Sequence, residues 1–206
     1  MSLHLNNLTI GYLNQQLFSI DSLCLENGIY LLSGKNGSGK STFCDVLAGI
    51  KQPLAGDYQE SLFPILYLGS TGVGMSDWSL LENIKILYWM FQTTLTPEIN
   101  EVIQQTLFWE NQLEQEYGSS SLGMQLKVGI SLLFSNLSWE LILFDETLSG
   151  LDQESTEMII NQLKNQHCPV VLVSHHGEEL ERKLKNKLKI SGGMLQYGTT
   201  EKIQFY

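Results

Sequence analysis

One segment constrains this chain more than any other, because it joins a glycine-rich turn to a lysine and a serine. Gly34–Ser41 reads Gly-Lys-Asn-Gly-Ser-Gly-Lys-Ser and fits the pattern GxxxxGK[ST]. The apolar run Ile29–Leu32 precedes it, and Phe43 and Val46 follow it at helical spacing. The sequence therefore predicts a strand, a phosphate-binding loop and a helix in direct succession.

The composition of this loop predicts how it would hold a phosphorylated ligand. Glycines let consecutive backbone N–H groups turn toward an anion, and the helix N-terminus adds the positive end of its dipole. Lys40 is expected to reach the β- and γ-phosphates of a nucleotide, and Ser41 to bind Mg²⁺. The predicted nucleotide-binding residues of the loop are Gly34, Asn36, Gly37, Ser38, Gly39, Lys40, Ser41 and Thr42.

A pair of carboxylates ends the apolar run Leu141–Phe144. Asp145 is predicted to bind Mg²⁺ through water, and Glu146 to polarise an attacking water molecule. An acidic pair at a strand end can also be a solvated turn. Its position downstream of a phosphate loop favours the metal and water roles.

Apolar runs separated by helical stretches predict the class of the fold. Leu141–Phe144 and Val170–Val173 are uniformly apolar and are separated by the helical stretch Gln153–Asn165. Such strands are typical of a parallel sheet that is covered on both faces. Strands are also expected over residues 3–32, a helical insert over about 78–117, and a hairpin over 184–197 that turns at Ser191-Gly192-Gly193.

Composition excludes several classes of function. The 206 residues carry a net charge of −10, which disfavours binding to nucleic acid. Arg182 is the only arginine, whereas kinases usually clamp a transferred phosphoryl group with several. No signal peptide or membrane span is expected from the sequence. Three well-separated cysteines, Cys24, Cys44 and Cys168, favour a reducing cytosol.

Two surface features have more than one interpretation. Lys183, Lys185, Lys187 and Lys189 alternate with apolar residues, which favours a solvated strand face, with contact to anionic lipid headgroups as the alternative. Trp89 and Met90 extend the apolar character of the predicted helix beyond one face. They either form the core of the helical insert or line a groove that receives a helix of a membrane subunit.

The ordered set of motifs resembles the ATP-binding cassette (ABC) transporter family along nearly the whole chain. The set comprises Gly34–Ser41, Ser121–Met124, Asp145-Glu146, Ser149–Asp152 and Ser174-His175. The resemblance implies a P-loop NTPase of the α/β class, with a mainly parallel RecA-like sheet, an N-terminal antiparallel β-subdomain and a helical signature-bearing insert. It also implies a single domain, 1–206, with a catalytic lobe (1–76 and 137–206) and a helical subdomain (about 77–136).

The resemblance assigns further roles. His175 would contact the γ-phosphate and the catalytic Glu146, and Asp152 would couple two active sites across a dimer. Tyr12 would stack on adenine, although it could equally be a tyrosine in a strand turn. Ser70 replaces the family glutamine that senses Mg²⁺, and its shorter side chain would need an intervening water. The signature loop, acting on the ATP of another subunit, would be Ser121, Leu122, Gly123 and Met124.

The resemblance also implies a function. Two identical or different chains would enclose two ATP molecules with Mg²⁺ and power an integral membrane transporter subunit from the cytoplasmic face of a membrane. Residues 67–84 are similar in part to the haem-exporter ATPase of cytochrome c maturation, which favours export. The alternatives are a regulatory cassette that binds ATP and hydrolyses it weakly, and an ATPase that remodels DNA or ribosomes. The acidic pI disfavours the last of these.

Overall fold

The apolar runs of the sequence become strands of one mixed sheet. The computed structural model describes residues 2–56, 64–109, 111–174, 180, 182–199 and 202–204. In these ranges the sheet has the strand order β1-β2-β8-β7-β3-β6-β5-β4, and β9 pairs with β8. The strands are β1 (Leu3–Tyr12), β2 (Gln15–Leu25), β3 (Gly28–Gly34), β4 (Ile65–Leu68), β5 (Leu141–Asp145), β6 (Pro169–Val173), β7 (Asn186–Ser191), β8 (Met194–Thr199) and β9 (Lys202–Gln204).

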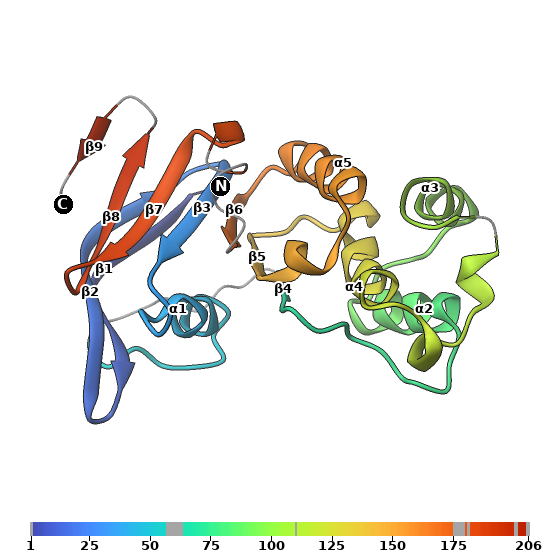
Figure 1. Cartoon of the computed structure of the whole chain (residues 1–206), viewed down its shortest axis with the longest axis horizontal. Helices are drawn as coiled ribbons and strands as arrows, with labels where there is room; N and C mark the ends of the chain where they lie inside the picture. Colours follow the sequence, from blue (N-terminus) through green and yellow to red (C-terminus); the bar gives the residue numbers. More distant parts are fainter. Residues whose placement is uncertain are drawn as a thin grey trace. The chain divides into compact units, whose positions relative to one another are not determined.

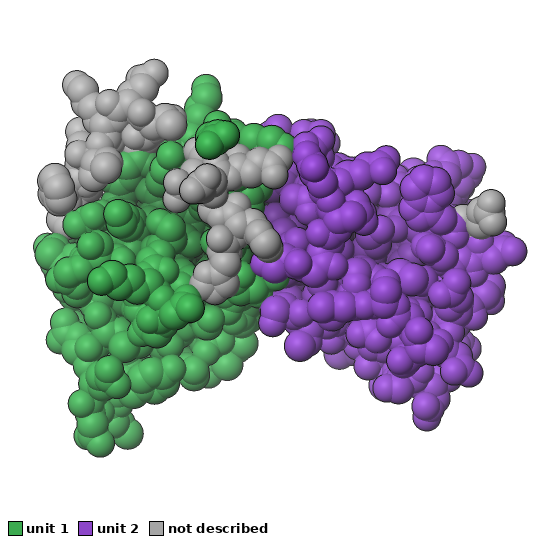
Figure 2. Space-filling view, in the orientation of Figure 1, with its two compact units in different colours: residues 1–67, 139–146, 166–206 green, residues 68–138, 147–165 purple. Residues whose placement is uncertain are grey.

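The chain separates into two compact units (Figure 2). Unit 1 comprises residues 1–67, 139–146 and 166–206, and unit 2 comprises residues 68–138 and 147–165. The separation into a catalytic lobe and a helical subdomain at 77–136 stays a prediction. The helices are α1 (Lys40–Leu47) in unit 1, and α2 (Leu80–Met90), α3 (Pro97–Leu107), α4 (Leu122–Ile130) and α5 (Gln153–Lys164) in unit 2 (Figure 1).

Parallel pairing organises unit 1 around β3. Leu31 of β3 lies opposite Leu172 of β6 on one side and Lys187 of β7 on the other. β5 then pairs in parallel with β6, whereas β1 and β2 form an antiparallel hairpin. Both parts of the expected sheet are therefore present: parallel central strands and antiparallel N-terminal strands.

The core of unit 1 lies between the sheet and α1. Phe43 of α1 is fully buried, and its ring meets that of Phe18 of β2 edge-on at 5.8 Å between centroids. Leu32 of β3 and Leu188 of β7 belong to the same apolar cluster. Because this cluster packs α1 onto the strands, the loop between β3 and α1 is held at both ends.

Side-chain caps begin the helices of unit 2. Ser79 and Glu82 form a capping box at α2, in which each side chain binds the backbone of the other residue. Thr96 caps α3 ahead of Pro97, a favoured first residue. Ser121 caps α4 and Asp152 caps α5. Each cap satisfies an amide that the helix itself leaves unpaired.

A short backbone ladder joins two loops of unit 2. Leu80 N donates to Gln115 O, and Tyr117 N donates to Trp78 O at 2.8 Å. The ring of Tyr117 packs on Gly74, where an added Cβ would lie 2.5 Å from Tyr117 Cε2. The segment before α2 and the segment before α4 are therefore fixed to each other.

The helical insert predicted over about 78–117 consists of separate helices, and one interpretation of its apolar residues is wrong. The helical pattern over 78–117 is broken, because Gln92 adopts a φ of +53° after α2 and Pro97 begins a new helix. Trp89 and Met90 are exposed, so they are not part of the core of the insert.

In the described ranges, no helix has the length and apolar character required to cross a bilayer.

Substitution of Asn83 tests how much its hydrogen bonds to the segment before α2 stabilise the fold. Its fully buried side chain accepts a hydrogen bond from Met75 N at 2.6 Å and donates to the carbonyls of Met75 and Ser79. Asn83→Ala should lower the free energy of unfolding by roughly 2–4 kcal/mol, because the backbone groups of Met75 and Ser79 lose a partner that is itself fully buried.

Urea unfolding of the variant and the parent chain measures this loss. Asn161→Ala, at an exposed position of α5, is the control and should change stability by less than about 0.5 kcal/mol. Equal small losses in the two variants would show that Asn83 does not hold the segment.

Candidate functional site

The phosphate loop adopts a backbone that only glycine tolerates well. Gly37 has a φ of +76° and Gly39 a φ of +102°. A Cβ on Gly39 would lie 2.9 Å from Leu17 Cδ1, so the loop also approaches β2 too closely for a side chain. Gly39 is the N-cap of α1 and provides no side-chain hydrogen bond. The first amides of α1 are therefore not capped by the residue that precedes them.

Lys40 folds back over its own loop. Its Nζ donates to the carbonyl oxygens of Gly34 at 3.0 Å and Lys35 at 3.3 Å. The side chain is buried, which is uncommon for a lysine. Its ammonium therefore lies within the curl of the loop, at the start of α1.

A cavity of about 430 Å³ in unit 1 brings together most of the predicted nucleotide-binding residues. Gly34 and Ser38 do not line it; they line a different cavity of unit 1. The predicted residues that do line it are Tyr12, Asn36, Gly37, Gly39, Lys40, Ser41, Thr42 and Glu146.

Tyr12 belongs to a cluster of side chains at the rim of this cavity. Its hydroxyl lies 3.0 Å from Thr42 Oγ1, and Lys51 Nζ lies 5.5 Å from the centroid of its ring. Lys51 in turn binds Asp45 at 2.6 Å, a contact that raises the pKa of the lysine. The hydroxyl of Tyr67 donates to the same carboxylate. This cluster orients a ring that is 51% exposed.

Asp145 ends β5 and Glu146 follows it, and the two carboxylates have different surroundings. Glu146 has a φ of +61°, a left-handed conformation that costs a non-glycine residue free energy, and its amide donates to Val173 O at 3.0 Å. Asp145 Oδ1 is buried and has no hydrogen-bond partner within the described residues. Burial raises the pKa of the Cys44 thiol, and the charge of Asp145 raises it further.

These donors fit a magnesium ion. Mg²⁺ prefers hard oxygen ligands such as hydroxyls and carboxylates. Ser41 supplies a hydroxyl at the first turn of α1, and Asp145 supplies a buried carboxylate oxygen that lacks a partner in the described part of the chain. Both residues belong to unit 1, whereas Ser70 lies in an exposed bend of unit 2.

The predicted signature loop has a site of its own in unit 2. Ser121 Oγ accepts a hydrogen bond from Met124 N at 3.3 Å, so the serine caps α4 as well as facing a cavity of about 460 Å³. A Cβ on Gly123 would lie 3.1 Å from Gly150 O. This close approach brings Ser121, Leu122, Gly123, Met124 and Asp152 to one cavity.

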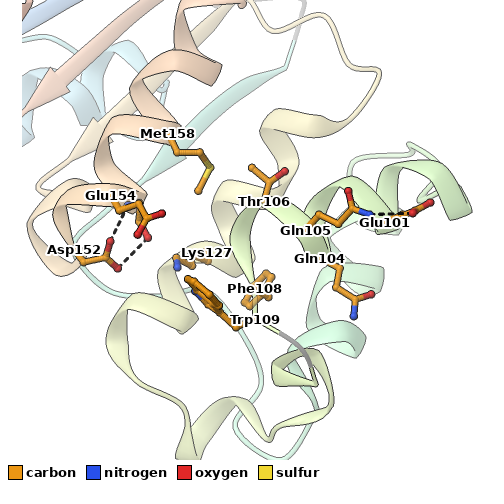
Figure 3. A pocket seen from close by; sticks show the side chains of 11 residues that line it. Glu101, Gln104, Gln105, Thr106, Phe108, Trp109, Lys127, Asp152, Glu154 and Met158 are labelled. Atoms are coloured by element: carbon orange, nitrogen blue, oxygen red, sulfur yellow. Dashed lines mark hydrogen bonds between the residues drawn. The ribbon is translucent and has the colours of Figure 1, made fainter.

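A buried lysine lies behind the signature loop, and the sequence reasoning missed it. Lys127 of α4 is only 8% exposed and points toward Asp152 and Trp109 in a cavity of about 680 Å³ (Figure 3). Burial lowers its pKa, although the charges of Asp152 and Glu154 oppose that shift. Among the described residues, its ammonium has no hydrogen bond or ion pair.

The sequence contains a signal for one of the site residues that were not predicted and none for the others. Helical spacing places Lys127 one turn after Gly123, a signal that could have identified it. Lys51 and Asp45 had no comparable signal, because only the folded chain brings them to Tyr12. His175 lies outside the described residues.

Lys127 provides a test of electrostatics in unit 2. Because its folded-state pKa is lowered, the unfolded chain binds more protons between that pKa and about pH 10.5, and below this interval the buried ammonium costs its full amount of stability. Lys127→Met should raise the free energy of unfolding at pH 7 by roughly 1 kcal/mol. This advantage should shrink as the pH rises toward about 10.5.

Chemical unfolding of both chains between neutral and alkaline pH measures the difference. Lys85→Met, at an exposed position of α2, is the control and should show no such pH-dependent gain. Destabilisation by Lys127→Met at every pH would contradict an ammonium that is buried at a cost.

Comparison with known proteins identifies the family. A family model described as "ABC transporter" matches residues 18–149. The ribose import ATP-binding protein RbsA of Lactococcus lactis is 25% identical over 87% of this chain, which spans only 41% of RbsA. The cytochrome c biogenesis ATP-binding export protein CcmA of Rickettsia felis is 28% identical over 85% of this chain and 93% of its own length.

A solved structure supports the same fold. The structure described as the ATP-binding subunit of an ABC transporter superposes with a TM-score of 0.82, at 21% identity, over 98% of this chain and 91% of that chain. Its sheet and phosphate loop therefore correspond to a known architecture, the α/β P-loop NTPase fold. With a family model matched across residues 18–149, the chain belongs to the ABC transporter family.

Proposed function

We propose that this chain is an ATP-binding and ATP-hydrolysing subunit of an ABC transporter. The observation that carries the proposal is the cavity of about 430 Å³, where the phosphate loop, Tyr12 and Glu146 meet in one unit. A polyphosphate and a purine base need these three features together. A glycine-rich turn without a function would require neither the buried lysine nor the carboxylate.

The residues of the loop would bind and neutralise the phosphates of ATP. Lys40 already places its ammonium within the loop, so it would exchange two carbonyl contacts for phosphate oxygens. Ser41 and Asp145 would hold Mg²⁺, which supplies neutralisation of the charge that develops during phosphoryl transfer. The backbone amides at the start of α1 would bind the same anion.

Glu146 would orient the attacking water. Its left-handed backbone and the hydrogen bond from its amide to Val173 O fix the direction in which the side chain leaves β5. Strain of this kind is common where geometry serves catalysis. His175 would stabilise the charge that develops on the γ-phosphate, as the family resemblance implies.

Hydrolysis would need a second cassette. Lys40 and Glu146 line a cavity of unit 1, whereas Ser121 and Gly123 line a cavity of unit 2. In a head-to-tail pair of identical or related chains, the signature loop of one chain would bind the ATP held by the other. Asp152, which lines the signature cavity, would couple the two sites.

The partner would be an integral membrane subunit that the cassette engages at the cytoplasmic face of a membrane. Export is the favoured direction, because CcmA, a relative named for export, is matched over 93% of its length. A role in cytochrome c biogenesis is one form of this proposal. Trp89 and Met90 are exposed on α2 and are candidates for contact with the membrane subunit.

Steady-state hydrolysis tests the assignment of Glu146. Glu146→Gln should lower the rate of ATP hydrolysis by roughly 100-fold or more and leave ATP binding intact, because the amide cannot polarise water as a carboxylate does. The matched control is Glu101→Gln, at an exposed position of α3, which should retain full activity.

The same assay tests the paired cassette. Specific activity should increase with protein concentration if two chains form the site. Hydrolysis that is undiminished in Glu146→Gln would remove this residue from the mechanism. Specific activity that is constant at all concentrations would contradict the dimer but not ATP binding.

Tyr12 and Lys51 should govern recognition of the base. Tyr12→Ala should weaken ATP binding by roughly tenfold through the loss of a stacking surface. Lys51→Met should weaken it severalfold, since an exposed cation–π contact contributes about 0.5–1 kcal/mol to the position of the ring. Titration calorimetry with ATP and with inorganic tripolyphosphate separates base from phosphate, and equal losses for both ligands would contradict stacking.

A further inference from the structure

A second cavity of unit 1, of about 920 Å³, contacts the phosphate loop together with strands β7, β8 and β2. Gln15, Leu17 and Gly37 line both this cavity and the smaller one, which holds most of the predicted nucleotide-binding residues. The proposed function uses Gly34 and Ser38 of its lining and gives no role to Lys35 or to the lining residues of β7 and β8. We refer to it as the lysine cavity, after Lys35, Lys187 and Lys189 in its lining.

The register of the sheet fixes two of these lysines. Lys187 and Lys189 alternate with the buried Leu188 and Ile190, so they share the face of β7 that points away from the core with α1. Lys189 is paired with Ser33 of β3 and with Gln196 of β8. A position fixed by two neighbouring strands is defined more closely than a loop position.

A glycine opposite one lysine leaves room in the cavity. Lys187 is paired across β7 and β8 with Gly198, which has no side chain to fill the space beside it. At the turn between these strands, Gly192 and Gly193 have φ values of +60° and +76°, and nothing lies within 4 Å of a Cβ added to either. At the turn between β7 and β8, the rim of the cavity is therefore backbone with free space beside it.

The charge of the cavity is opposite to that of the whole chain. The chain carries 12 basic residues and a net charge of −10. Three of the basic residues line this cavity, and the described lining includes no carboxylate. Within the described ranges, none of the three ammonium groups has a hydrogen bond or ion pair. A cavity with this charge selects an anion.

We propose that the lysine cavity binds a ligand with several phosphate charges, at a site separate from the nucleotide. Three ammonium groups and open glycine backbone suit phosphate oxygens better than a single carboxylate. The ligand is either a free polyphosphate or a phosphorylated lipid headgroup. The site does not depend on ATP being the substrate, because Lys187 and Lys189 lie outside the smaller cavity.

Calorimetry with inositol hexakisphosphate as the probe tests the site in the full chain. Lys187→Gln/Lys189→Gln should weaken binding of the probe by roughly tenfold or more. Lys183→Gln/Lys185→Gln removes the same charge from exposed positions outside the cavity and should have a much smaller effect. Saturating ATP should leave binding of the probe unchanged, and thermal unfolding of every variant checks that it folds.

The variants also define the results that overturn the site. Equal weakening by the two double variants would mean diffuse attraction to surface charge. Loss of the probe at saturating ATP, with no effect of Lys187→Gln/Lys189→Gln, would place the probe in the phosphate loop. Either result overturns the lysine cavity, and neither affects the test of Glu146.

Vesicles distinguish the two sources of the ligand. The probe is phosphatidylcholine vesicles in which about one lipid in five is phosphatidic acid. Cosedimentation that depends on Lys187 and Lys189 identifies a lipid headgroup, whereas binding of inositol hexakisphosphate alone identifies a soluble polyphosphate. Binding to neither probe overturns the proposal.

Discussion

The parallel pairing of β3 with β6, and of β6 with β5, is the constraint on which the rest of unit 1 depends. Parallel strands end at the same edge of a sheet, so the phosphate loop at the end of β3 and the carboxylates of Asp145 and Glu146 at the end of β5 are brought to one edge. The core with α1 then fixes the loop from its helical side. The sheet and α1 therefore position the loop and the two carboxylates without further residues.

The site also contains groups that are costly for a folded chain. Glu146 has a left-handed backbone, Lys40 is buried, and Asp145 Oδ1 is buried with no partner in the described part of the structure. Lys127 is a similar case in unit 2. Such a cost in folding free energy is expected where a side chain binds an anion, a metal or water. Stability alone would favour apolar residues at these positions.

Much of the fold could be predicted from the sequence, because the signals were local. The strand, loop and helix around Gly34–Ser41, and the hairpin that turns at Gly192, follow from apolar runs and glycines. The end of α2 could not be located from the sequence, since a left-handed Gln92 has no clear signature there. The contacts of Tyr12 with Lys51, and the lysine cavity, depend on strand pairing and could not be predicted from local spacing.

The packing of Tyr117 on Gly74 also limits how this sequence can change. An alanine at position 74 would bring its Cβ within 2.5 Å of the tyrosine ring, so the ring excludes every larger residue there. A smaller residue at position 117 would remove that exclusion but leave a cavity. Acceptable replacements at the two positions must therefore occur together. Over evolutionary time, the segment before α2 and the segment before α4 are expected to vary as a pair.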